Sequence, residues 1–362
     1  MLKTLKRARD RFFGTGEADT SVPVLDGALK PNNLLETAEV FFERPGLEDL
    51  AIDAHGQLYV AAGPEVLLIG ADGRVQDTIG LQARAQALAV CHGNLVAATS
   101  QGLQFLAGPQ VGRHVQSFGG HPIQCINALS EGPDGTLLLS EGSHAVPCDE
   151  WTADLLTHGR SGRVLAYDPR DDSCRVLAQG LAYCFGVCMH EDGVLASESW
   201  AHRVQVLRDG RMQAGLSEIP GYPGRIAPAS GGGYWLSIFA PRSQLLEFVL
   251  REDVFRKEMM STVEPRYWIA PAFSSGQDFL EPLQQGSVRQ MGILKPWAPP
   301  RSYGLVLRLS ADLAPLFSMH SRVGGVHHGI VAAQEYAGSL LALSKGSGRL
   351  LRLPLFEQNP QA

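Results

Sequence analysis

The chain has 362 residues, of which 44% are hydrophobic and 19% are charged, so it is long enough to bury a large core. Its formal net charge of −6 at pH 7 argues against a nucleic-acid-binding surface or a strongly basic membrane-binding surface. No apolar run approaches the ~18 residues that a membrane-spanning helix needs. We therefore expect no nucleic-acid partner and no membrane span.

The N-terminal residues 1–20 are basic, but no apolar stretch follows the charges, so they do not resemble a secretory signal. We expect a short amphipathic helix that lies on the domain, with a membrane or partner contact as the alternative. Without an export signal, the expected location is cytoplasmic.

None of the cysteines forms a CxxC pair. Cys184 and Cys188 are four residues apart, but in a strand they would point the same way without the geometry of a zinc site. Without an export signal, we expect reduced thiols that are mostly buried as small apolar residues. The six cysteines are Cys91, Cys125, Cys148, Cys174, Cys184 and Cys188.

One pattern recurs along the chain: an apolar run, a turn that usually ends in Gly, and a second apolar run. Short strands separated by Gly turns are typical of antiparallel all-β structure. The six copies are Gly46–Ala62, Ala85–Thr99, Cys125–Gly142, Cys184–Ser199, Gly224–Phe239 and Gly329–Ser344. Their spacing of roughly 40 to 60 residues, with one longer gap, predicts a six-bladed β-propeller; a pair of β-sandwiches is the alternative.

We expect residues 1–44 to form an N-terminal arm with edge strands of the first blade, and residues 45–357 to form the propeller. Two stretches break the repeat. His144–Arg163 falls between two strands of the third blade. Residues 251–302 form a long insertion between blades five and six, after a third apolar run at 245–250.

The long insertion begins with a segment, REDVFRKEMM, that we predict to be helical. The rest is either a binding loop or a packing insertion that covers a blade edge. In both cases four of its aromatic residues could wall an apolar pocket: Trp268, Phe273, Phe279 and Trp297.

Propeller ligands bind around the central channel, where the innermost strand of each blade begins. Each blade therefore contributes one side chain to a common ring. Counting back from the turn of each repeat gives Glu48, Gln86, Asn127, Phe185, Arg225 and, for the last blade, His328 or Ile330. Glu and Asn oxygens suit Ca²⁺ or Mg²⁺, whereas Phe and Arg do not.

Over roughly residues 45–355 the chain resembles the strictosidine-synthase-like family, within the six-bladed propellers that include paraoxonases and gluconolactonases. The stretches that carry the resemblance are Gly46–Asp53, Ser161–Pro169, Leu195–Val204, Gly221–Ile226, Tyr234–Arg242 and Tyr303–Leu309. The resemblance implies a propeller with a small-molecule site at the channel mouth. None of these stretches is specific for one reaction.

Metal-dependent members of this group hold a cation with a glutamate and asparagines, and Glu48 and Asn127 match such positions. The asparagine of the family's F-x-N-G-V segment is here Phe185, and the Asp-Asn of its GYPDN segment is here Gly224-Arg225. An arginine at this position would repel Ca²⁺. We therefore expect no cofactor, with a Ca²⁺ ion held by Glu48 and Asn127 as the alternative.

Strictosidine synthase itself is metal-free and uses a glutamate near the start of the last inner strand. The corresponding stretch here, Gly324–Val331, contains His327 and His328 but no carboxylate. We predict Glu48, His328 and His327 as catalytic residues, with a histidine as general acid or base; the alternative for each histidine is a structural role. Glu48 is expected to pair with Arg225, which would keep both ionised.

The remaining predicted site residues bind substrate. Arg225 would hold negative charge, the aromatic residues would form walls, and His144 would lie on a loop above the channel. The full set is Asn127, Arg225, Phe185, Tyr183, Gln86, His144 and Trp200.

The sequence thus favours a small-molecule enzyme that resembles strictosidine synthase, has a degenerate metal site, and acts on an organic carbonyl or anionic substrate. Two alternatives remain: a divalent-metal-dependent lactonase or esterase, and a non-catalytic ligand-binding propeller.

Overall fold

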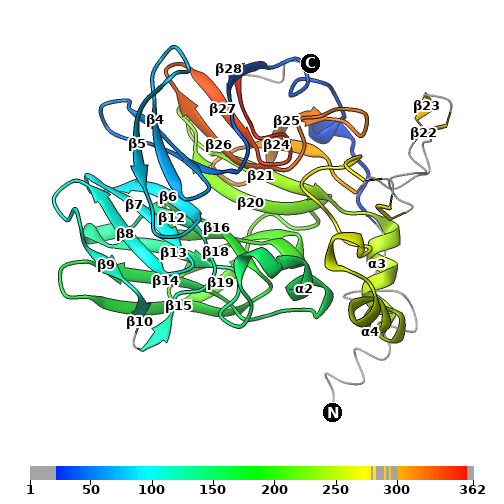
Figure 1. Ribbon diagram of the computed structural model, residues 1–362, viewed down its shortest axis with the longest axis horizontal. Helices are drawn as coiled ribbons and strands as arrows, with labels where there is room; N and C mark the ends of the chain where they lie inside the picture. The colour runs from blue at the N-terminus through cyan, green and yellow to red at the C-terminus, as the bar shows by residue number, and fades with distance from the viewer. Residues whose placement is uncertain are drawn as a thin grey trace.

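The computed structural model describes residues 22–118, 120–278, 280–282, 289–290, 293–294 and 301–356. In this part of the chain, six four-stranded antiparallel sheets form a ring (Figure 1). The predicted six-bladed β-propeller is confirmed. Within the described residues, no helix has the length and apolar character to cross a membrane.

Each blade runs from an innermost strand at the channel to an outermost strand at the rim. The first three blades are β2 (Leu47–Ile52), β3 (Leu58–Ala62), β4 (Glu65–Ile69) and β5 (Val75–Gly80); β6 (Ala85–Cys91), β7 (Asn94–Thr99), β8 (Gly102–Ala107) and β9 (His114–Val115); and β12 (Ile126–Glu131), β13 (Leu137–Glu141), β14 (Gly162–Asp168) and β15 (Ser173–Leu181). The fourth and fifth are β16 (Cys184–His190), β17 (Gly193–Glu198), β18 (Arg203–Arg208) and β19 (Arg211–Ala214); and β20 (Gly221–Pro228), β21 (Tyr234–Pro241), β24 (Gly304–Leu309) and β25 (Pro315–Ser321). Neighbouring inner strands contact one another all the way round.

The sixth blade closes the ring with strands from both ends of the chain. It contains β26 (Ile330–Tyr336), β27 (Ser339–Ser344), β28 (Arg349–Pro354) and β1 (Glu39–Glu43). We expected the region before residue 45 to supply edge strands of the first blade. Instead, β1 pairs antiparallel with β28, with Glu39 opposite Arg352.

The long insertion lies inside the fifth blade rather than between blades five and six. Its two flanking strands, β21 and β24, pair with each other, with Tyr234 opposite Leu309. The apolar run at 245–250, expected to be a strand, lies in helix α3 (Gln244–Arg251). The predicted helical segment is α4 (Asp253–Thr262).

The core consists of apolar layers between neighbouring blades. Between blades one and two, for example, Leu88, Leu95 and Val66 pack with small alanines. Burial of each such large side chain is worth about 1.5–3 kcal/mol.

The other elements are short and lie outside the blades. They are α2 (Trp151–Leu156), the 3-10 turns η2 (Gly27–Leu29), η3 (Pro133–Gly135), η4 (Cys148–Glu150), η5 (Ser199–Ala201) and η6 (Pro265–Tyr267), and the two-residue strands β10 (Ser117–Phe118), β11 (His121–Pro122), β22 (Arg289–Gln290) and β23 (Ile293–Leu294). Figure 1 shows α2, α3 and α4 together on one side of the ring.

Candidate functional site

A β-bulge near the start of every inner strand builds the channel mouth. In each blade the pairing of the first two strands shifts register at one or two residues, which are left without a ladder partner. Bulges of this kind re-aim side chains and are common beside active sites. Here the bulges include the ring residues Glu48, Gln86, Asn127, Phe185, Arg225 and Val331.

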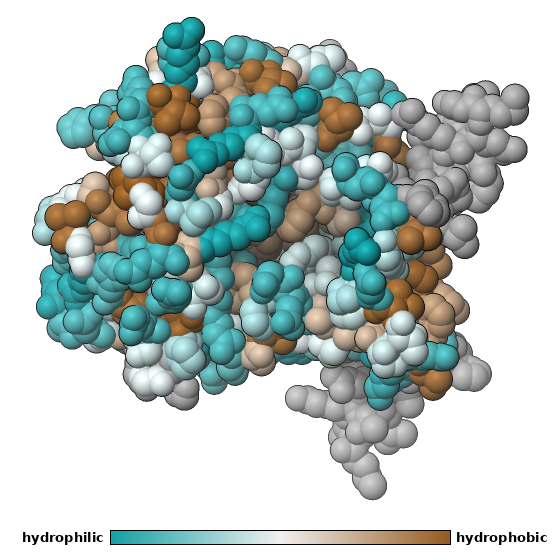
Figure 2. All heavy atoms as spheres, in the orientation of Figure 1, coloured by the Kyte–Doolittle hydropathy of each residue, from teal (hydrophilic) through white to brown (hydrophobic). Residues whose placement is uncertain are grey.

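All six ring residues line one pocket of about 390 Å³. Five of them are the residues predicted from the repeat. The sixth is Val331, not His328 or Ile330. The molecular face in Figure 2 is hollowed near its middle, where hydrophilic side chains border hydrophobic ones.

One side of the pocket is aromatic. Trp151 packs edge-on against Phe239, with ring centroids 5.6 Å apart, and lies 5.3 Å from Phe273. Phe185 lies 5.1 Å from Phe239. Together with Tyr183, these residues form what we call the aromatic wall.

Both stretches that interrupt the repeat contribute to this wall. Trp151 comes from the interruption in blade three, and Phe273 from the long insertion in blade five. The long insertion is therefore in part a pocket-lining segment. Trp268 instead packs in a separate core beneath α3 and α4, while Phe279 and Trp297 lie outside the described residues.

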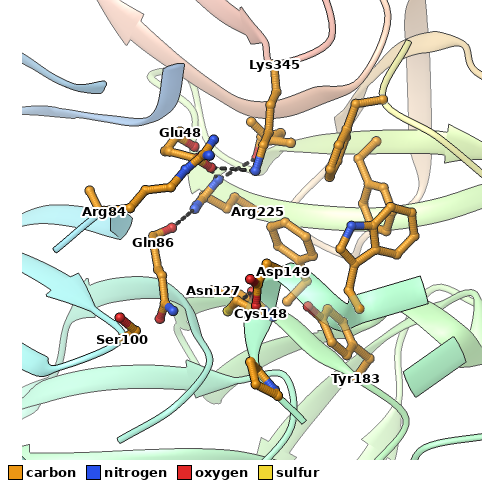
Figure 3. A pocket seen from close by; sticks show the side chains of 17 residues that line it. Glu48, Arg84, Gln86, Ser100, Asn127, Cys148, Asp149, Tyr183, Arg225 and Lys345 are labelled. Carbon is orange, nitrogen blue, oxygen red and sulfur yellow. Dashed lines mark hydrogen bonds and ion pairs between the residues drawn. The ribbon is translucent and has the colours of Figure 1, made fainter. Parts of the chain in front are cut away.

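The opposite side of the pocket carries a charged cluster of Glu48, Arg84 and Lys345. Arg84 Nε donates to Glu48 Oε1 at 2.6 Å, and Lys345 Nζ lies 2.5 Å from Glu48 Oε2. The Glu48 side chain is 6% exposed, whereas those of Lys345 and Arg84 are 26% and 61% exposed. Both carboxylate oxygens of a buried acid are thus neutralised by cations that still reach the pocket (Figure 3).

Arg225 pairs with Asp49 rather than with the Glu48 carboxylate, which corrects the expected pair. Its Nε lies 3.0 Å from Asp49 Oδ2. Its guanidinium also donates to the backbone carbonyls of Glu48, Gln86 and Val331, at 3.1, 2.8 and 3.3 Å. Arg225 therefore ties blade five to blades one, two and six from the centre of the ring.

Burial shifts the pKa values of two groups in this region. It raises the pKa of Asp49 to about 6, although Arg225 and two backbone N–H groups act in the opposite direction. Burial lowers the pKa of Lys345; Glu48 opposes this shift, and Arg84 and Arg225 add to it. The Lys345 ammonium therefore loses its proton more readily than the ammonium of an exposed lysine does.

Asn127 and Gln86 use their amides to join neighbouring blades. Asn127 Nδ2 donates to the Cys184 carbonyl at 3.1 Å. Gln86 Nε2 donates to the carbonyl of Gln124, and its Oε1 accepts from Ile126 N. Both side chains line the pocket while holding the inner strands together.

A disulfide joins Cys125 and Cys148, so the expectation of six reduced cysteines is wrong. Their Cα atoms lie 4.7 Å apart, because the blade-three loop folds back over the start of β12. The bond lies at the pocket, with Cys148 in its lining and Asn127 Oδ1 3.3 Å from Cys148 Sγ. Spacing alone does not reveal this loop geometry.

The other four cysteines are free. Burial raises the pKa of the thiols of Cys91 and Cys188 to about 12, and that of Cys174 to about 11. Burial also raises the pKa of the Cys184 thiol. Such thiols are poor nucleophiles at neutral pH.

His327 and His328 are not among the described residues that line the pocket. His328 Nδ1 lies 2.7 Å from Ser302 Oγ and its Nε2 3.0 Å from the Arg322 carbonyl; burial lowers its pKa. His327 Nδ1 lies 2.8 Å from the Leu35 carbonyl. Both rings thus contact structural partners, and their catalytic role stays a prediction.

Three other predicted residues occupy different positions. Tyr183 lines the pocket in a left-handed backbone conformation, with φ 60°, which is uncommon for an aromatic residue. Trp200 lies behind it, stacked at 4.4 Å, and donates to Asp154 Oδ1. His144 is exposed, with Nδ1 2.6 Å from the Ser161 carbonyl, and is not among the described lining residues.

The donor set of this ring does not fit a Ca²⁺ site. Ca²⁺ takes about six to eight oxygen ligands, but Glu48 already pairs with two cations, and Phe185, Arg225 and Val331 occupy three ring positions. Among the described residues, no group of three or more His, Cys, Asp or Glu could hold a metal ion.

Sequence reasoning missed the two cations of the charged cluster. Arg84 directly precedes the inner strand β6, and Lys345 follows β27 in the turn to β28. A search for charged residues just before inner strands would have found Arg84. Nothing local marks Lys345, whose partner Glu48 is 297 positions away.

Residues 127–206 match the family model for strictosidine synthase. A strictosidine synthase-like protein of Arabidopsis thaliana is 22% identical over 218 residues, which is 58% of each chain. The adipocyte plasma membrane-associated protein of Salmo salar is 26% identical over 252 residues, or 66% of this chain and 54% of that protein. The chain spans about half the length of these curated relatives.

Two solved structures share the fold. A gluconolactonase from Xanthomonas campestris has a TM-score of 0.57 and 15% identity, covering 93% of this chain and 96% of that one. Regucalcin, a calcium-binding protein from Agrobacterium tumefaciens, has a TM-score of 0.55 and 13% identity, covering 89% and 97%. At these identities the likeness concerns the fold alone.

Proposed function

We propose that this six-bladed propeller, which matches the strictosidine synthase family model over residues 127–206, is a small-molecule enzyme acting on an organic carbonyl or anionic substrate. The observation that carries this proposal is the division of one pocket into an aromatic wall and a charged cluster. Pockets that combine apolar walls with a few convergent polar groups are the usual sites of small ligands.

The two sides of the pocket define how a substrate would lie. An apolar or aromatic body would pack on Trp151, Phe239 and Phe273, which offer ring faces and edges. A carbonyl oxygen or an anionic group would then point at Arg84 and Lys345, the two cations of the charged cluster.

Glu48 is the group best placed to move a proton. It is buried, lines the pocket, and contacts Lys345 through a short charged hydrogen bond. Positioned acid–base groups typically contribute about 10²–10⁴-fold to a rate. We propose that Glu48 has this role. We also propose that the reaction needs no metal ion, because Arg84 and Lys345 already supply positive charge at the Glu48 carboxylate.

The test is a turnover screen with aromatic aldehydes, α-keto acids, lactones and esters, with and without a chelator. We expect turnover that is insensitive to the chelator and about 10²-fold slower in Glu48→Gln. Glu258→Gln, at an exposed position on α4, is the matched control and should retain wild-type rates.

Other outcomes would favour the alternatives. Hydrolysis that a chelator abolishes and Ca²⁺ restores would favour a metal-dependent lactonase or esterase, with Glu48 and Asn127 as ligands. If the wild type and Glu48→Gln both showed saturable ligand binding and neither showed turnover, a non-catalytic binding propeller would be favoured.

A further inference from the structure

We propose that Lys345 is an amine nucleophile that forms an imine with the carbonyl substrate, with Glu48 as its proton-exchange partner. This inference rests on the proposed function, since it requires a carbonyl compound in the same pocket. It adds the covalent step and names the residue that performs it.

The backbone holds Lys345 rigidly at the pocket. Its N–H donates to the Gly329 carbonyl at 2.9 Å, and the next residue, Gly346, donates to the His328 carbonyl at 3.2 Å. A Cβ at Gly346 would overlap the Phe273 carbonyl, so this turn and the long insertion are in close contact. The amine is therefore placed by a tight turn rather than by a free loop.

The side chain of Lys345 extends from this turn into the pocket. Nζ lies 4.7 Å from the centroid of the Phe273 ring and 2.5 Å from Glu48 Oε2. About a quarter of the side chain is exposed, on the side where the cavity lies. A carbonyl compound packed on the aromatic wall would thus meet the amine at its reactive end (Figure 3).

Burial favours the neutral form of the amine, and the charges around it act in both directions. Among the residues that the structure describes, Glu48 from β2 is the anion that contacts the amine, and it also pairs with Arg84. Arg225 from β20 adds positive charge, partly offset by Asp49, and Asp149 lies elsewhere in the lining. Burial together with Arg84 and Arg225 lowers the pKa of Lys345, which is the usual way an amine nucleophile is activated.

The step balances with the groups present. The ammonium of Lys345 gives a proton to the Glu48 carboxylate, and the free amine attacks the carbonyl carbon. The carbonyl oxygen takes the proton from Glu48, which then accepts a proton from the new C–N nitrogen. Finally that proton goes to the hydroxyl, which leaves as water while the nitrogen lone pair forms the C=N bond. The products are a protonated imine, water and ionised Glu48.

The test uses the full chain with 4-carboxybenzaldehyde, an anionic aromatic aldehyde, in the presence of cyanoborohydride. Peptide mapping compares the rate of reductive labelling at Lys345 with that at Lys257, an exposed lysine on α4. We expect Lys345 to react at least about tenfold faster, because more of it is neutral at pH 7. Labelling no faster than at Lys257 would overturn the inference.

Variants separate the nucleophile from a structural role. Lys345→Arg keeps a cation beside Glu48, so it should stay folded by thermal unfolding and lose the fast label. Lys257→Arg should leave the fast label unchanged. In Glu48→Gln the carboxylate no longer favours the ammonium, so the onset of Lys345 labelling should move to lower pH. An unchanged onset would contradict the assigned proton partner.

An analogue without the aldehyde, 4-(hydroxymethyl)benzoate, separates this inference from the proposed function. Binding is followed by calorimetry, with Phe273→Ala as the variant that removes part of the aromatic wall. Binding without fast labelling of Lys345 by the aldehyde overturns the imine but leaves the pocket's function. Absence of both binding and labelling counts against the imine and the proposed function together.

Discussion

Asp49 lies beneath the charged cluster and is an unusual acid for a protein core. Its two oxygens accept backbone N–H groups of Leu50 and Leu88 at 2.9 Å, and Arg225 lies 3.0 Å away. These contacts orient the carboxylate but do not fully offset its burial, which raises its pKa to about 6. Asp49 therefore takes up a proton in the folded state at a pH where the unfolded chain does not.

This difference predicts a pH dependence of stability. With a folded-state pKa above the unfolded value, Asp49 weakens the fold above pH ~6, and this penalty fades as the pH falls toward ~4. Relative to Asp49→Asn, which does not titrate, the wild type should gain up to about 1.4 kcal/mol of unfolding free energy per pH unit lowered in this window. Urea unfolding of both proteins between pH 4 and 7 checks it; a constant difference would show that Asp49 does not titrate there.

At the scale of elements, the disulfide fixes one wall of the pocket. Cys148 precedes α2, which carries Trp151, and Cys125 precedes the inner strand β12. The bond closes a loop between residues 23 apart in sequence. Without it, the loop that holds Pro147, Asp149 and Trp151 over the pocket would be attached only through its ends and its packing.

We expect the double variant Cys125→Ala/Cys148→Ala to lose about 3 kcal/mol of unfolding free energy, because a loop of this length gains entropy in the unfolded chain. Affinity for 4-(hydroxymethyl)benzoate should also fall as Trp151 is released. Thermal unfolding and calorimetry measure the two effects. Cys174→Ala, at a half-buried free thiol, is the control. If the control and the double variant lost equal amounts of unfolding free energy and of affinity, the disulfide-closed loop would not explain these effects.

The inner strands were predictable because each carries an apolar run bounded by a turn that usually ends in Gly, and five ring residues followed from counting back from that turn. Helix α3 was not recognised. Its apolar residues Leu245, Leu246 and Val249 lie on one helical face, and Ser243 caps it by accepting from Leu246 N at 3.3 Å. Because this run was interpreted as the third strand of blade five, the long insertion was predicted to follow that blade. In the structure the insertion lies between β21 and β24 of the same blade.

The partners within the site were harder to predict than its positions. Glu48 meets Arg84 from the next blade and Lys345 from the last one, 36 and 297 positions away. Counting within a repeat yields one residue per blade but says nothing about which turns of other blades reach the same point. Arg225 lies in an irregular stretch of β20 and pairs with Asp49, the residue next to the ring position that the repeat indicates.

For the whole molecule, closure of the ring depends on β1. The strand supplies the outer edge of blade six, and Phe41 is buried there, 6.3 Å from the Tyr336 ring and 3.8 Å below the Arg352 guanidinium. Apart from the contacts of Arg225 at the centre, each blade packs on its two neighbours, and this pairing joins the N-terminal strand to the three C-terminal strands of blade six. Loss of the β1–β28 pairing should thus affect every blade, not only the sixth.

We expect Phe41→Ala to lower the global unfolding free energy by about 3 kcal/mol, the cost of removing a large buried aromatic side chain, and to lower the urea midpoint of all probes together. Val40→Ala, at a 40% exposed position on the same strand, is the control and should change little. Hydrogen exchange distinguishes the mechanisms. If Phe41→Ala raised exchange only in β1 and β28 and left the midpoint unchanged, closure would be a local contact, and the remaining blades would hold the ring without it.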